Sequence, residues 1–267
     1  MKYGVWSAYF VELPFEEMVR EFIGQGYDCS ELSDEHGFAL LERGDPIKVG
    51  AECRRYAQDL GFSFPQGHLW LASNICNPEH VDGLKKWLDL FNALGITSAV
   101  LHTGYIREAP LEAVNEARVK ALEILTDYIK GTDLVICLEN LTHDLSLSQP
   151  ILDLINTVNS PNLAVCLDTG HLNIMGGDQY EFIKNCGNKL KALHIADNEG
   201  KTDQHMMPFG RGNVNWKAVV RGLKEVGYDY LFNLEIPGER LAPIEIQRLK
   251  LAYIKGMCEY MLNDMPL

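Results

Sequence analysis

Short apolar runs alternate with longer amphipathic stretches along the whole chain. The short runs are rich in Val, Ile and Leu and predict eight strands, at residues 2–6, 28–32, 62–68, 98–102, 134–139, 163–168, 190–196 and 231–235. The longer stretches place apolar residues three to four positions apart and predict eight helices, at residues 15–23, 47–60, 81–94, 111–129, 151–158, 180–186, 216–226 and 244–261. Strands joined by helices of this length run parallel, because each helix returns the chain to the edge from which it started.

Eight strand–helix units in 267 residues match a closed (β/α)8 TIM barrel better than the alternative, an open doubly wound sheet. No linker interrupts the alternation, so we expect one α/β domain over residues 1–267. Five glycines stand between a predicted helix and the next strand: Gly26, Gly61, Gly95, Gly131 and Gly227. Glycine at such a position commonly ends a helix in the left-handed conformation, and these residues support the predicted boundaries.

The composition is that of an ordinary globular enzyme, with 46% hydrophobic and 23% charged residues. The 37 acidic residues outnumber the 24 basic ones, and the net charge of −13 disfavours binding to nucleic acid or to an anionic membrane surface. The seven cysteines are scattered without a CxxC pair, no apolar run is long enough to span a membrane, and the first residues lack the pattern of a secretory signal. We therefore expect a cytoplasmic protein with reduced thiols.

Six of the predicted strands carry an acidic residue or a histidine at or near their carboxyl end. In chain order these residues are His68, His102, Glu139, Asp168, His194 and Glu235. The carboxyl ends of the strands meet at one mouth of a TIM barrel, so these side chains are expected to converge there. Carboxylates in one cavity repel each other unless a cation neutralises them, and a set of oxygen and imidazole ligands suits Mn²⁺, Zn²⁺, Co²⁺, Fe²⁺ or Mg²⁺. The pattern predicts a divalent metal site at the mouth.

Two loops add further candidates. His171 lies three residues after Asp168, close enough to face the same cavity. The long polar loop after residue 196 contains Asp203 and His205, which we interpret as metal ligands or substrate-binding residues, with a solvated loop as the alternative. Arg211 lies between two glycines of that loop and is expected to bind an anionic or hydroxylated substrate, unless it forms a surface ion pair.

The remaining candidates have weaker support. Glu31, near the end of the second predicted strand, is expected either to form the far wall of the pocket or to pair with a cation. The aromatic residues expected on apolar walls, at the rim or in the core are Trp6, Trp70 and Phe209. The histidines away from strand ends, which we expect on the surface or in loops, are His36, His80 and His143.

Eight short motifs carry a family resemblance. They are GH at residues 67–68, LH at 101–102, LEN at 138–140, LDTGH at 167–171, LHIAD at 193–197, DQH at 203–205, PFGRG at 208–212 and LE at 234–235. Together they resemble the xylose isomerase-like TIM-barrel superfamily, and most of all its sugar phosphate isomerase/epimerase branch, which includes ketose 3-epimerases and inositol-catabolic isomerases. The resemblance runs from the third strand to the eighth and is specific for the superfamily, but much less so for the substrate.

The resemblance implies a divalent-metal-dependent isomerase or epimerase that moves a proton through a metal-stabilised enediolate of a small carbohydrate. The residues that would bind one metal ion are Glu139, Asp168, His194 and Glu235. The residues that would contact the substrate are His68, His102, His171 and Arg211. The two glutamates would also act as acid and base on opposite faces of the substrate. A homodimer is compatible with this resemblance.

Endonuclease-IV-type AP endonucleases, which belong to the same superfamily, are the alternative. The residues that match their three zinc sites are His68, His102 and Glu139; Glu139, Asp168, His194 and Glu235; and His171, Asp203 and His205. The net charge of −13 and the absence of a basic segment beside the mouth disfavour DNA as a partner. A non-catalytic sugar-binding barrel is a further alternative, which the pair of glutamates disfavours.

Overall fold

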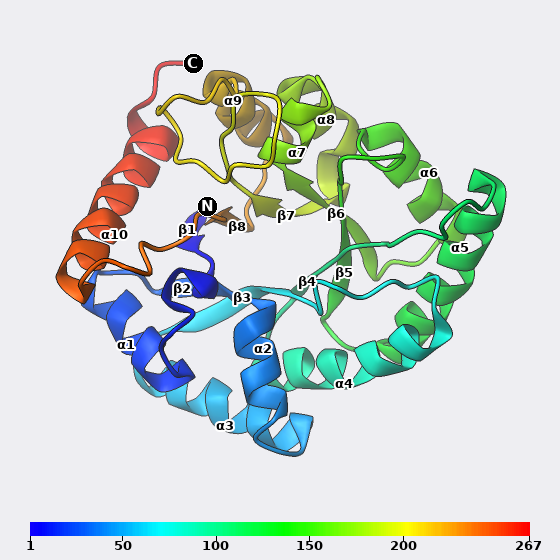
Figure 1. The fold of residues 1–267 in the computed structure, drawn as a ribbon, viewed down its shortest axis with the longest axis horizontal. Coiled ribbons are helices and arrows are strands. Elements are labelled where there is room, and N and C mark those ends of the chain that lie inside the picture. Colours follow the sequence, from blue (N-terminus) through cyan, green and yellow to red (C-terminus); the bar gives the residue numbers. More distant parts are fainter.

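Eight parallel strands surround a central axis in the computed structural model, which describes residues 1–267 (Figure 1). The strands are β1 (Lys2–Val5), β2 (Cys29–Leu32), β3 (Ser63–His68), β4 (Ser98–Leu101), β5 (Val135–Glu139), β6 (Leu163–Asp168), β7 (Leu190–His194) and β8 (Leu231–Leu234). Strands β2 to β7 pair in chain order, and β1 pairs with β8. Every predicted strand is present.

Two short bridges join these groups of strands into a closed barrel. Trp6 forms a parallel bridge with Glu31 beyond the end of β1, and Ile195 forms one with Leu234 between β7 and β8. The amide of Ile195 donates to the Asn233 carbonyl at 2.8 Å, so the closure includes a good backbone hydrogen bond. The structure is therefore the predicted (β/α)8 TIM barrel rather than an open sheet.

Most of the helices form the outer ring in Figure 1. The helices are α1 (Phe15–Gly24), α2 (Asp34–Leu41), α3 (Pro46–Asp59), α4 (Pro78–Leu94), α5 (Leu111–Tyr128), α6 (Ser148–Val158), α7 (Thr169–Ile174), α8 (Gln179–Cys186), α9 (Trp216–Val226) and α10 (Ile244–Glu259). All eight predicted helices are present, and the predicted helix-ending glycines have φ between 67° and 88°. No helix combines the length and the apolar character that a membrane span requires.

The sequence did not predict α2 and α7, because α7 has only six residues and α2, although as long as α8, lacks a clear amphipathic period. Each is instead fixed by its N-cap, which satisfies a free backbone N–H group. The Ser33 hydroxyl accepts from the His36 amide before α2, and the Asp168 carboxylate accepts from the His171 amide before α7. Asp168, a predicted metal ligand, is therefore also the N-cap residue of α7.

The prediction that His36 lies on the surface or in a loop is wrong. The residue belongs to α2, and its side chain is only 4% exposed. Helix α2 folds back over the segment after β1, so the imidazole is enclosed between them. Its Nδ1 lies 3.0 Å from the Ser7 hydroxyl and its Nε2 lies 3.0 Å from the Leu13 carbonyl oxygen. The histidine ties α2 to the first loop of the barrel. His80 and His143 are partly exposed, as expected.

The inside of the barrel is filled by small side chains below a polar layer. The buried interior cluster consists of Val100, Cys137, Ala164, Cys166 and Ala192. Because side chains alternate along a strand, the residue two positions later points the same way. His102, Glu139, Asp168 and His194 therefore stand directly above this small-residue floor. A second, larger core fills the space between strands and helices.

Candidate active site

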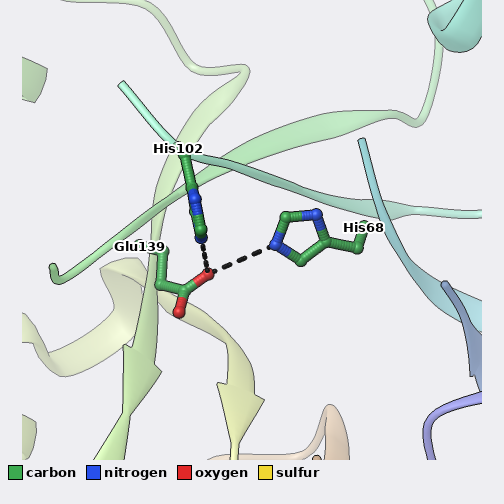
Figure 2. A group of neighbouring side chains, drawn as sticks. All are labelled: His68, His102 and Glu139. Atoms are coloured by element: carbon green, nitrogen blue, oxygen red, sulfur yellow. Dashed lines mark hydrogen bonds and ion pairs between the residues drawn. The ribbon is translucent and has the colours of Figure 1, made fainter. Parts of the chain in front are cut away.

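Glu139 at the end of β5 is the centre of the site. Its side chain is 1% exposed, and its Oε2 atom lies 3.0 Å from His102 Nε2, 3.5 Å from His68 Nε2 and 3.3 Å from His194 Nδ1. Figure 2 shows the imidazoles of His68 and His102 aimed at this one oxygen from neighbouring strands. The other oxygen, Oε1, lies 3.3 Å from His171 Nδ1. Four predicted site residues thus surround one buried carboxylate.

Two groups made only of carboxylate and imidazole ligands are close enough to share a cation. The ligand atoms of Glu139, Asp168, His194 and Glu235 all lie within 4.8 Å of one another, as do those of His68, His102 and Glu139. Strand register contributes directly, because Asp168 on β6 is the register partner of His194 on β7. The six residues predicted from the strand ends are therefore brought together at one mouth.

A third group lies at the edge of this cluster, between α7 and the loop after β7. Asp203 Oδ2 is 3.2 Å from His171 Nε2 and 3.1 Å from His205 Nε2. The Asp203 side chain is 40% exposed, whereas His171 is 12% exposed. This group is more open to solvent than the first two.

Three buried polar atoms in the cluster have no hydrogen-bond partner: His68 Nε2, Asp168 Oδ2 and His194 Nδ1. An unpaired buried polar atom is costly, so each one calls for an explanation. All three belong to residue types that coordinate divalent metals, and all three face the same cavity. The residues present therefore fit a divalent cation.

The second nitrogen of four site histidines is held by a protein oxygen. The pairs are His68 Nδ1 with the Leu69 carbonyl (2.7 Å), His171 Nδ1 with the Asn140 carbonyl (2.9 Å), His194 Nε2 with the Glu31 carboxylate (3.0 Å) and His205 Nδ1 with the Glu235 carbonyl (2.8 Å). In the neutral form of the ring, which is the form that binds a metal, such a bond assigns the proton to the held nitrogen and leaves the other nitrogen free to accept. Metal-binding histidines are commonly oriented in this way.

The two glutamates have opposite pKa shifts. Burial alone would raise the pKa of Glu139, but the neighbouring imidazoles of His194 and His102 outweigh it and hold this pKa well below its usual range. Burial raises the pKa of Glu235 to about 7, and although two imidazoles oppose the rise, repulsion from Glu139 and Asp168 adds to it. Neighbouring acids whose environments separate their pKa values are typical of acid–base pairs.

The histidines respond to the same carboxylates. Burial would lower their pKa values, but nearby carboxylates raise the pKa of His171 to about 12 and that of His205 to about 10. Burial and charge also act in opposite directions on Asp203, whose pKa falls far below its usual range because of these two imidazoles. The potential in the cavity therefore favours positive charge, as a cation site requires.

The loop that supplies Asp203 and His205 is fixed by Asp197. The backbones of Asp197 and Met206 exchange two hydrogen bonds of 2.8 and 2.9 Å, which fold the loop back on itself. The Asp197 carboxylate accepts from the Val214 amide and from the Trp216 indole, both at 3.1 Å. His205 has a φ of 44°, an unfavourable conformation for a residue with a side chain, and such strain is commonly found at functional sites.

Two residues behind the cluster were not given their roles by the sequence analysis. Glu31 is fully buried and accepts from both His194 Nε2 and the Asn233 side chain, so it neither lines an open wall nor meets a lysine or arginine. The Asn140 amide group accepts from the Asp168 backbone at 2.7 Å and donates to the Asp168 carbonyl at 3.0 Å. Asn140 follows Glu139 in the LEN motif, which was the available signal for it.

Arg211 does not join the cluster, although the sequence placed it with the substrate-binding residues. Its side chain is 75% exposed, and its guanidinium lies 3.7 Å from Glu199, which matches the surface ion pair considered as the alternative.

Of the three aromatic candidates, Trp6 stacks on His205 with ring centroids 6.3 Å apart. Trp70 packs against the His80 ring, and Phe209 is half exposed beside Tyr260.

The profile of one family, described as xylose isomerase-like TIM barrel, matches residues 24–256. The chain belongs to this family. The chain is similar to a fructoselysine 3-epimerase of Escherichia coli O157:H7, which is 24% identical over 251 residues and is matched over 88% of this chain and 90% of its own length.

Two further proteins are similar to this chain, one in sequence and one in fold. Inosose isomerase of Bacillus subtilis is 25% identical over 231 residues, which cover 77% of this chain and 82% of the relative. The crystal structure of a D-psicose 3-epimerase in the presence of D-fructose superimposes with a TM-score of 0.81 at 17% identity, covering 98% of this chain and 99% of the other. The named relatives are sugar epimerases and isomerases, and the structural likeness confirms the barrel.

Proposed function

We propose that this protein is a divalent-metal-dependent isomerase or epimerase of a small ketose or keto-polyol. The observation that carries the proposal is the position of the two glutamates, whose Oε2 atoms both lie 3.3 Å from His194 Nδ1. Glu139 ends β5 and Glu235 follows β8, so the two carboxylates approach His194 Nδ1 from different strands. Their pKa values are shifted in opposite directions. The sugar isomerases and epimerases among the relatives support the reaction class.

Glu139, Asp168, His194 and Glu235 would hold the metal ion. A divalent ion bound there would act as a Lewis acid that polarises a substrate carbonyl and makes the neighbouring C–H group acidic. Asn140 would keep Asp168 in position, and Glu31 would keep the His194 ring oriented with Nδ1 inward.

Glu235 is the better proton carrier of the two glutamates. In the metal-free site burial raises the pKa of Glu235 to about 7, whereas Glu139 stays ionised among its histidines. Glu235 therefore holds a proton more readily than Glu139, and a bound divalent ion would lower both pKa values. Proton removal on one face and return on the other would give epimerisation, and transfer between adjacent carbons would give aldose–ketose isomerisation. His171, His68 and His102 would hold substrate oxygens beside this pair.

The test is conversion of a panel of ketoses and inososes, followed by NMR, with protein reconstituted with Mn²⁺ or Co²⁺. Glu235→Gln keeps the size of the side chain but cannot carry the proton, so it should stay folded and lose turnover. Glu52→Gln, which changes an exposed carboxylate on α3, is the matched control and should keep full activity. Turnover that survives in Glu235→Gln, or a wild-type protein inert toward the whole panel, would contradict the proposal.

A second candidate function is metal-dependent phosphodiester hydrolysis of the endonuclease-IV type. The specific observation in its favour is the third group, in which His171 and His205 converge on Asp203 Oδ2 beside the two larger groups. Metal analysis separates the two functions. About one ion per chain supports the isomerase, whereas nearly three zinc ions per chain together with cleavage of abasic-site DNA would support the hydrolase. The cytoplasmic location, the homodimer and the substrate-binding role of Arg211 stay predictions.

A further inference from the structure

A pocket of about 510 Å³ opens beside the active site on the side of His102. Its walls come from the loops after β3, β4 and β5, and include Ser73, Asn74, Tyr105, Arg107 and His143. His102 is the shared wall, because its Nε2 atom also touches Glu139, as Figure 2 shows. A substrate that reacts at the glutamates therefore has room to extend into this pocket.

The charge of this pocket differs from that of the rest of the molecule. The chain has a net charge of −13 and a mouth crowded with carboxylates, yet no Asp or Glu lines this pocket, whereas Arg107 and two histidines do. The Arg107 side chain is 87% exposed, and its only ion pair is a 3.5 Å contact with the equally exposed Glu108. Such a surface pair is weak, so the guanidinium is free to turn toward a ligand.

The Ser73 hydroxyl in the same pocket has no hydrogen-bond partner. Ser73 is 5% exposed, and its Oγ atom is among the few buried polar atoms without a partner outside the metal-ligand set. Burying this hydroxyl costs free energy of folding, because the group gives up its hydrogen bonds to water and forms none within the protein. The Oγ atom is buried in this structure, so the Ser73 side chain has to turn toward the pocket before a ligand oxygen can become its partner.

The backbone of the pocket loops is held in place by contacts within the protein. Gly104 has a φ of 66°, and a Cβ atom there would lie 2.3 Å from the Asn74 side chain, so only glycine allows the two loops to meet. The fully buried Arg118 donates to the Gly104 carbonyl and pairs with Asp144, whose carboxylate lies 2.7 Å from His143 Nδ1. The pocket is therefore shaped before any ligand arrives, which lowers the cost of binding.

We propose that this pocket is a subsite for an anionic group, a phosphate or a carboxylate, at the far end of the substrate. Arg107 forms the charge-assisted contact, since guanidinium matches both oxyanions, and the Ser73 hydroxyl donates to a second oxygen. Placing the reacting end of the substrate over Glu139 and Glu235 rests on the proposed function, but the existence of the subsite does not.

The test is equilibrium binding of three open-chain probes, measured by calorimetry on the metal-reconstituted protein. D-glucitol 6-phosphate carries the phosphate, D-gluconate carries the carboxylate, and D-glucitol is neutral. At least one anion should bind about tenfold more tightly than D-glucitol, as one charge-assisted hydrogen bond predicts. The anion with the larger gain identifies the group.

Arg107→Ala should remove this gain, whereas Arg55→Ala, which deletes an exposed charge on α3, should leave it unchanged. Ser73→Ala should weaken binding of the anion and leave the free energy of unfolding undiminished, because the hydroxyl has no partner within the protein. A merely structural Ser73 would instead lower the stability. Equal binding of all three probes, or equal behaviour of Arg107→Ala and Arg55→Ala, would overturn the proposal.

The outcome is independent of the reaction, because none of the probes has an aldehyde or ketone to enolise. Selective anion binding by a protein that converts no sugar would refute the proposed function and leave the subsite standing. Turnover of neutral ketoses by a protein that shows no preference for anions would refute the subsite alone.

Discussion

Removing the charge of Glu31 tests whether the residues behind the cluster tune a metal site. The Glu31 carboxylate is fully buried and accepts from His194 Nε2 at 3.0 Å, while the His194 Nδ1 atom faces the cavity. Glu31→Gln keeps the shape but replaces a carboxylate by a neutral amide. The change weakens the bond that orients the ring and makes the imidazole a poorer electron donor.

The size of the effect follows from this single bond. A hydrogen bond to a charged group contributes about 1.5–3 kcal/mol. Since about 1.4 kcal/mol corresponds to a factor of ten, metal affinity should fall roughly 10- to 100-fold. The assay is competition between the protein and a chromophoric chelator for Mn²⁺ or Zn²⁺.

Asn233→Ala is the matched control for a loss of stability. Asn233 is the other donor to Glu31, so its removal disturbs the same buried pair but keeps the carboxylate and its bond to His194. We expect this variant to unfold at lower denaturant concentration and to lose much less metal affinity than Glu31→Gln. Wild-type affinity in Glu31→Gln, or an equal loss in both variants, would refute the role assigned to Glu31.

Other predictions concern the rest of the structure. Replacing the fully buried Arg118 by Leu leaves the Gly104 carbonyl without this donor and the partly exposed Asp144 carboxylate with His143 as its remaining partner, and should cost about 1–3 kcal/mol in urea unfolding. Burial would raise the pKa of Asp144, but Arg118 outweighs it and lowers this pKa. The pair therefore stabilises the fold at neutral pH, and this stability is lost as the pH falls below about 4. In Asp144→Asn the free energy of unfolding should depend less on pH in this acidic range. Gly212→Ala would place a Cβ atom 2.0 Å from the Asp197 carboxylate and should abolish turnover while circular dichroism still shows the barrel. Chelator treatment should lower the melting temperature, and Mn²⁺ at about 100 times its Kd should restore about 2.7 kcal/mol.

The sequence predicted the barrel and the main cluster because both depend on local patterns. Strand, helix and glycine signals recur once in each unit, and the inward-facing residue at a strand end needs only the alternation of side chains to be placed. For this reason Glu139, Asp168 and His194 were found without coordinates. Register then brings Asp168 and His194 opposite each other.

What the sequence did not show depends on contacts between distant parts of the chain. Glu31 and His194 are 163 positions apart and meet only because the barrel closes. The burial of Arg118 is hidden in the same way, since a charged residue on an amphipathic helix is expected to face water until a loop covers it. The exposed position of Arg211 was also hidden, because its glycine neighbours do not determine which way a loop side chain points.

Solvent-deuterium incorporation is the most direct test of the proposed reaction. Metal-loaded protein is incubated in D₂O with a ketose that it converts, and the carbons next to the carbonyl are examined by NMR and mass spectrometry. We expect deuterium at that carbon in the product and in recovered substrate, with exchange lost after metal removal and in Glu235→Gln. Conversion without any deuterium incorporation, or exchange that persists in metal-free protein, would contradict metal-dependent proton transfer by these glutamates.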